Sequence, residues 1–128
     1  MALYYAHQQI DPGTYSLPLI IGDQELLIST IQVPGFAPAN TVNIRVSVHW
    51  QKPLTSDIGQ LDLLLRSGGE GGLLLADTEA TCYEETTSKL VYSAPSGTGA
   101  DTSYVLLAKS VDRRALITGP ITVEAVVL

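Results

Sequence analysis

With 128 residues, the chain has the length of one domain that can bury a sizeable core. The net charge of -6 and the small number of Lys and Arg residues, seven, leave no basic patch for phosphates, so we expect neither nucleic acid nor an anionic membrane as a partner. Charged residues make up only 16% of the chain, so we expect part of its surface to be covered by copies of the same chain. No apolar run is long enough to cross a bilayer, so we expect no membrane insertion.

The first dozen residues are predicted to be an N-terminal arm (1–12) ahead of a single domain (13–128). Tyr4, Tyr5 and His7 in this arm either dock on a neighbouring molecule or are disordered. The opening residues have no cationic start and no apolar run of secretory length, so no classical export signal is expected.

Two strands are predicted next. The first covers residues 15–21 and follows the turn-forming residues Asp11-Pro12-Gly13. The second, Leu26–Val33, is fairly apolar on both faces, which suits a strand inside a sandwich or against another subunit. Two prolines and a glycine make residues 34–40 a loop.

The clearest pattern is the unbroken alternation of apolar and polar residues over Val42–Trp50. Side chains two residues apart lie on the same face of a strand, so the pattern predicts one apolar wall and one polar face. The wall consists of Val42, Ile44, Val46, Val48 and Trp50, and the polar face of Asn43, Arg45, Ser47 and His49. This is the pattern of a half-buried antiparallel strand.

The second half of the chain contains further short runs with the pattern of strands. Leu61–Arg66 and Leu73–Asp77 flank the glycine-rich segment Ser67–Gly72, which predicts a hairpin. Further strands are predicted at about 80–83, 89–93, 103–111 and 121–128. Eight or nine short strands between Gly and Pro turns indicate an all-β fold, an antiparallel β-sandwich or jelly roll.

Groups for catalysis are few. Of the two histidines, His49 lies on a polar strand face and His7 lies on the predicted arm. No Gly-x-Ser-x-Gly motif is present, and the glycines at 68–72 lack the Lys and Ser/Thr of a phosphate-binding loop. We therefore expect no catalytic residues, no cofactor and no enzymatic activity.

A metal site is not expected either. One cysteine and two histidines cannot form a structural zinc site within one chain. The carboxylate pairs at 77/79 and 84/85 match no calcium-binding loop and are interpreted as solvated turns. Cys82, the single cysteine, excludes an intrachain disulfide, which leaves an inert thiol or a bridge between chains.

Four runs of sequence carry a resemblance to a known family: Val42–Trp50, Leu61–Arg66, Tyr104–Ala108 and Ile117–Ala125. Their order and texture resemble the trimeric jelly rolls of the tumour necrosis factor and complement globular-head superfamily. The bacterial versions, which cap collagen-like or filamentous proteins on spore surfaces, are the most similar. The resemblance implies two five-stranded sheets in jelly-roll order, a threefold axis, and termini that lie near one another at one end.

Two functions follow as expectations. The first is a non-enzymatic structural and interaction module, a homotrimeric head displayed on a spore surface, filament or virion, with itself and a collagen-like stalk or filament as partners. Such a protein would be assembled from the cytoplasm of the producing cell. The second is a carbohydrate-binding or phage receptor-binding domain that recognises a glycan or surface receptor, with Trp50 or the tyrosines as stacking platforms.

Trp50 shares a phase with the apolar wall, so core or subunit interface is favoured over an exposed sugar platform. Apolar residues also occur on the opposite faces of several predicted strands, such as Leu27, Val105 and Leu107, which motivates the trimer. The residues expected in the core or at the trimer interface are Trp50, Tyr104, Leu106, Val123, Val126 and Leu128.

Overall fold

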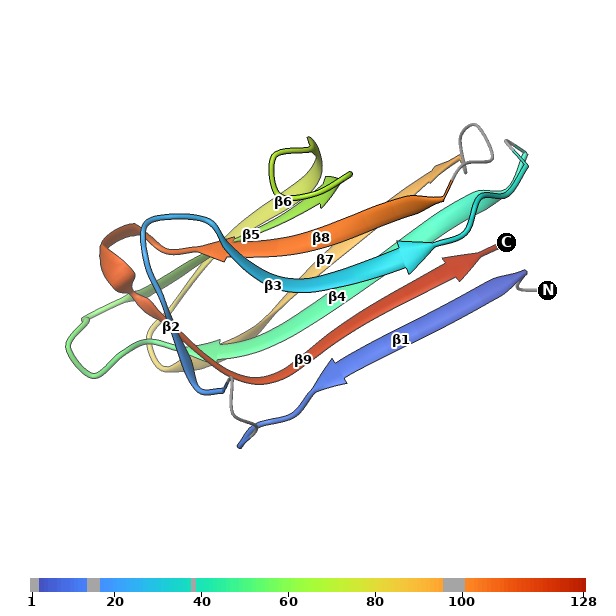
Figure 1. The fold of residues 1–128 in the computed structure, drawn as a ribbon. Helices are drawn as coiled ribbons and strands as arrows, with labels where there is room; N and C mark the ends of the chain where they lie inside the picture. The colour runs from blue at the N-terminus through green and yellow to red at the C-terminus, as the bar shows by residue number, and fades with distance from the viewer. Residues whose placement is uncertain (1–2, 14–16, 38, 96–100) are drawn as a thin grey trace.

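The computed structural model describes residues 3–13, 17–37, 39–95 and 101–128, and these residues form two antiparallel β-sheets packed face to face (Figure 1). Sheet A has the strand order β1-β9-β4-β7, with the short β2 beside β9. Its strands are β1 (Tyr4–Ile10), β2 (Leu19–Ile21), β4 (Thr41–Gln51), β7 (Glu85–Pro95) and β9 (Ala115–Val127).

Sheet B has the strand order β3-β8-β5-β6, so among the described residues it has four strands where the resemblance implies five. Its strands are β3 (Leu26–Val33), β5 (Gly59–Ser67), β6 (Leu73–Cys82) and β8 (Thr102–Lys109), and a single 3-10 turn, η1 (Val111–Arg113), joins β8 to β9. From β2 onward, successive strands alternate between the sheets except where β5 and β6 form a hairpin, which is the strand order of a jelly roll. The predicted all-β fold class is confirmed.

The core lies between the sheets and is built by the period of two along each strand. β4 pairs with β9 on one side and with β7 on the other, so its inward residues meet inward residues of both neighbours. Val46, for example, lies opposite Val123 of β9 and Leu90 of β7. The largest fully buried side chains are Trp50, Ile21, Ile44, Leu61, Leu63, Leu65, Leu106, Leu107, Ile117, Val33, Val42 and Val48.

The predicted N-terminal arm is wrong for residues 4–10. These residues form β1, which pairs with β9 over its whole length, from Tyr4 opposite Val127 to Ile10 opposite Ile121. Tyr4, Ala6 and Ile10 are partly buried against the core. The polar Gln8 stands in the phase of these inward residues and interrupts the apolar alternation, which hid the strand from the sequence pattern.

Other boundaries also differ from the prediction. The segments expected at 73–77 and 80–83 belong to one strand, β6, and β8 ends at Lys109, before Val111. In the predicted strand at 15–21, only Leu19–Ile21 is a strand, and residues 14–16 lie outside the described residues. β9 begins at Ala115 rather than 121 because it continues through Gly119 and Pro120, where its pairing with β4 is irregular. A proline lacks the N–H of a regular ladder, so such an irregularity accommodates it.

Side-chain hydrogen bonds join the two sheets along one open side of the sandwich. β1 is an edge strand of sheet A and β3 an edge strand of sheet B. The Gln8 side-chain amide donates to the carbonyl oxygen of Thr30 at 2.8 Å and accepts from the Ser29 hydroxyl at 2.6 Å. The Tyr4 hydroxyl also donates to the carbonyl of Gln32, at 3.2 Å. These contacts occupy polar groups of β3 that an uncovered edge would offer to another chain.

Gly59 lies at a point of the core that leaves no room for a side chain. A Cβ atom there would lie 2.9 Å from Cζ3 of Trp50 and 3.0 Å from Sγ of Cys82. We predict that Gly59→Ala lowers the free energy of unfolding by about 1 to 3 kcal/mol, because overpacking forces buried groups to move. Urea denaturation measures the loss. Gly71→Ala is the control, since nothing lies within 4 Å of its added methyl group. Equal stability of the two variants would contradict the packing described.

Candidate functional site

The outer face of sheet A carries a groove of about 520 Å³ that runs across all four long strands. Two neighbouring cross-strand rows supply most of its side chains. In one row His7, Glu124, Arg45 and Val91 lie side by side on β1, β9, β4 and β7, and in the next Thr122, Ser47 and Lys89 lie on β9, β4 and β7. The groove is therefore formed by residues from both ends and the middle of the chain.

The cations of the groove have no partner within the described residues. Neither Arg45 nor Lys89 forms a hydrogen bond or ion pair there, and both side chains are exposed. Glu124 lies directly opposite Arg45 but accepts a hydrogen bond from the Tyr5 hydroxyl, at 3.2 Å from its Oε2. Two cationic groups are thus available to a bound anion.

Tyr5 places an apolar ring and a polar hydroxyl at the rim of the groove. Tyr5 is 58% exposed, and Val91, on the other side of the groove, is 65% exposed. Desolvation raises the pKa of Tyr5, and the hydrogen bond to the Glu124 carboxylate and its negative charge raise it further. The Tyr5 hydroxyl therefore stays protonated at neutral pH and acts as a donor to Glu124.

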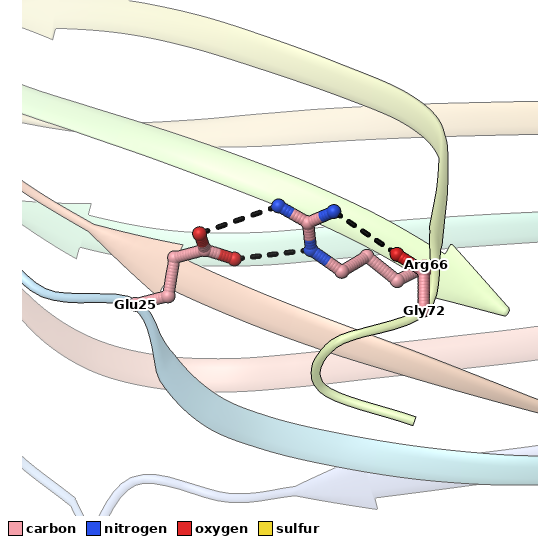
Figure 2. Close-up of polar contacts among 3 residues, drawn as sticks. All are labelled: Glu25, Arg66 and Gly72. Carbon is pink, nitrogen blue, oxygen red and sulfur yellow. Dashed lines mark hydrogen bonds and ion pairs between the residues drawn. The ribbon is translucent and has the colours of Figure 1, made fainter. Parts of the chain in front are cut away.

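The outer face of sheet B differs because the chain covers its apolar residues itself. Leu64, Val105 and Leu107 form a small buried cluster on this face, outside the main core. β8 lies between β3 and β5, so the ion pair between Glu25, just before β3, and Arg66 of β5 spans β8. Figure 2 shows the Arg66 guanidinium between the Glu25 carboxylate and the carbonyl of Gly72. The alkyl stem of an arginine in this position shields apolar neighbours from water.

This covering removes part of the basis for the predicted trimer. Val105 and Leu107 were expected to need a partner chain, but they are buried within one chain. Leu26 and Leu27 of β3 remain 40% and 41% exposed.

Four of the residues expected in the core or at the trimer interface lie in the core of the single chain: Trp50, Tyr104, Leu106 and Val123. Val126 is half-buried on the outer face of sheet A, beside the groove, and Leu128 is exposed. The set therefore does not form one surface.

Trp50 cannot serve as the sugar-stacking platform that the second expectation allowed. Its side chain is 0% exposed, and its indole Nε1 donates to the Ser88 hydroxyl at 2.9 Å inside the sandwich. His49, predicted on the polar face, lies on the surface, where it contacts Thr87 at 2.9 Å and Glu85 at 3.6 Å.

The remaining candidates offer little chemistry. Within residues 3–13, 17–37, 39–95 and 101–128, no group of three or more His, Cys, Asp or Glu side chains is placed to hold a metal ion. No helix in these ranges has the length and apolar character needed to cross a membrane. Cys82 is a free, buried cysteine, and desolvation raises the pKa of its thiol, while hydrogen bonding with the backbone of Lys52 and Glu84 partly offsets the effect. The thiol is protonated at neutral pH.

The sequence pattern placed Arg45 and Ser47 on an outward face but did not find the groove. Its other members lie on β1, β7 and β9, and only the pairing of these strands with β4 brings them together. A signal was present in Lys89 and Val91, which alternate with buried Leu90 within a predicted strand. Partner choice between strands is not readable from such local alternation.

Comparison with known proteins finds no matching family model and no matching curated protein. Similar solved structures include the Eiger tumour necrosis factor from S. frugiperda, with 12% identity over 97% of this chain and 92% of that chain and a TM-score of 0.46. A CBM4 structure has 9% identity over 98% of this chain and 72% of that chain, with a TM-score of 0.40. A structure of infectious bursal disease virus, Gx strain, has 10% identity over 98% and 40%, with a TM-score of 0.32. At such values the likeness indicates nothing about function.

We predict that the fluorescence of Trp50, the one tryptophan, is blue-shifted and poorly quenched by iodide, because no part of its side chain meets water. Trp50→Ala should lower the free energy of unfolding by about 3 to 5 kcal/mol, the usual cost of deleting a buried aromatic side chain. Circular dichroism in urea measures this loss. The control Val91→Ala, on the same sheet but exposed, should change stability by no more than about 0.5 kcal/mol. Emission at the wavelength of free tryptophan would show that the core is not closed.

Proposed function

We propose that this protein is a non-enzymatic binding domain that holds its ligand in the groove on the outer face of sheet A. The observation that carries the proposal is the pair of unpartnered cations, Arg45 and Lys89, beside the hydroxyl groups of Ser47 and Thr122 within one concave surface. A surface of this kind, with a few convergent polar groups on rigid strands, is suited to recognition.

The make-up of the groove supports binding rather than catalysis. A nucleophile needs a hydrogen-bonded base, and among the described residues neither Ser47 nor Thr122 has a side-chain hydrogen bond to His7 or Glu124. The Glu124 carboxylate is engaged by the Tyr5 hydroxyl instead. The groove residues Arg45, Lys89 and Val91 are exposed to solvent, so the groove would not exclude water from a reaction.

The proposal is tested by filling the groove. Ser47 lies in the middle of it, so Ser47→Tyr should abolish binding of any glycan that the wild-type protein selects on an array of neutral and acidic glycans. Thr30→Tyr is the matched control, because Thr30 is an exposed residue of β3 on the other sheet. Binding that survives Ser47→Tyr, or an array on which the wild-type protein selects nothing, would contradict the proposal.

A display head is a second candidate, favoured by the position of the chain ends. The backbone N–H of Leu3 donates to the carbonyl of Val127 at 2.7 Å, and Figure 1 shows the start of β1 and the end of β9 at the same end of the sandwich. A stalk joined there would leave the groove and the opposite end free. We propose accordingly that the domain serves as a homotrimeric head on a spore surface, filament or virion, with a collagen-like stalk or filament and a surface receptor as partners.

A trimer that leaves the groove open has to form elsewhere than on the outer face of sheet A. The exposed Leu26 and Leu27 of edge strand β3 provide apolar surface for such a contact. Light scattering coupled to size exclusion should then give a mass of about three chains, against 13.6 kDa for one. Because folding would be coupled to association, the melting temperature should also rise with protein concentration. A mass near that of one chain at micromolar concentration would exclude the trimer and leave the binding proposal untouched.

A further inference from the structure

We infer that the ligand of the groove is an anionic saccharide, a glycan with carboxylate or sulfate groups, and this inference rests on the proposed binding function. The three kinds of side chain that such a ligand requires, cations, hydrogen-bonding groups and apolar surface, occur together on the outer face of sheet A.

The cations are placed to act on one ligand. Arg45 lies opposite Val91, and Lys89 opposite Ser47, so Arg45 and Lys89 are diagonal neighbours on adjacent strands. Diagonal neighbours of an antiparallel pair are about 7 to 8 Å apart, within reach of one long anionic group or of two groups on neighbouring sugars. The planar guanidinium of Arg45 can form two parallel hydrogen bonds with a carboxylate or sulfate.

The cations remain free because their obvious intramolecular partner is directed elsewhere. Glu124 lies opposite Arg45, yet its Oε2 accepts from the Tyr5 hydroxyl, and no ion pair with Arg45 forms among the described residues. An anionic group of the ligand can therefore form ion pairs with Arg45 and Lys89 without first breaking an internal salt bridge. Such a site avoids the rearrangement cost that breaking an internal ion pair would add.

The rest of the groove matches a polyol. The hydroxyls of Ser47 and Thr122 each donate and accept, and neither has a side-chain hydrogen bond within the described residues. The exposed Val91 and the ring of Tyr5 supply apolar area for the C–H face of a sugar ring. A simple inorganic anion would use only Arg45 and Lys89, whereas a saccharide uses the whole groove.

The charge of the whole chain argues against a denser polyanion. With a net charge of -6, the protein repels nucleic acid at long range, and two local cations do not make the extended basic stripe that phosphate backbones require. A saccharide with few charges among many hydroxyls meets less repulsion and still gains the local contacts.

The experiment is isothermal titration calorimetry at low salt with trigalacturonic acid, a sulfated chondroitin tetrasaccharide and the neutral maltotriose. At least one acidic saccharide should bind the wild-type protein more than tenfold more tightly than maltotriose, and the affinity should fall as salt is added. The double variant Arg45→Gln/Lys89→Gln should lose at least tenfold of this affinity. Lys109→Gln, a cation on the outer face of sheet B, should lose none.

The two acidic probes distinguish the sources of charge: a preference for trigalacturonic acid assigns a carboxylated glycan, and a preference for the chondroitin probe a sulfated one. Binding of maltotriose as tight as that of the acidic probes, lost in Ser47→Tyr but kept in Arg45→Gln/Lys89→Gln, would overturn the anionic class while the binding function stood. Absence of binding by all three probes would overturn the inference as well. Melting temperatures of the variants, expected to match wild type, show that each is folded.

Discussion

The structure depends on the two-residue alternation of β4 and on its pairing with β9 and β7 on both sides. Even-numbered positions from Val42 to Trp50 are all buried in the core, and odd-numbered positions face the outer side of sheet A. A slip of one residue in this register would place Arg45 in the core and Val46 in water. The burial that stabilises the sandwich therefore also fixes which side chains form the groove and in which rows they lie.

Most of the remaining apolar surface is covered by other residues of the same chain. Gln8 ties the edge strand β1 to β3 across the open side of the sandwich, and the ion pair of Arg66 with Glu25 spans β8 above a small apolar cluster. The low content of charge, 16%, accordingly does not by itself require assembly. What distinguishes the two outer faces is pairing: on sheet B the arginine has a carboxylate partner, whereas on sheet A Arg45 has none among the described residues.

Local alternation predicted the strands in which it is unbroken. β3 was predicted with its observed bounds, and β4 extends the prediction by one residue at each end. It failed where a polar residue interrupts it, as at Gln8 in β1. It also missed the first half of β9, where the strand continues through Gly119 and Pro120 with irregular pairing. The groove could not be predicted for a different reason. Arg45 and Lys89 belong to segments far apart in sequence, and only long-range strand pairing makes them neighbours.

The central claim is that the outer face of sheet A, positioned by the register of β4, is the binding surface. Titration of trigalacturonic acid into isotopically labelled protein, followed by amide chemical shifts, tests it most directly. The account predicts that the largest shifts fall on Arg45, Ser47, Lys89 and Thr122, with the outer face of sheet B unaffected. Shifts centred on Leu64 and Lys109 of sheet B, or on no contiguous surface, would contradict it.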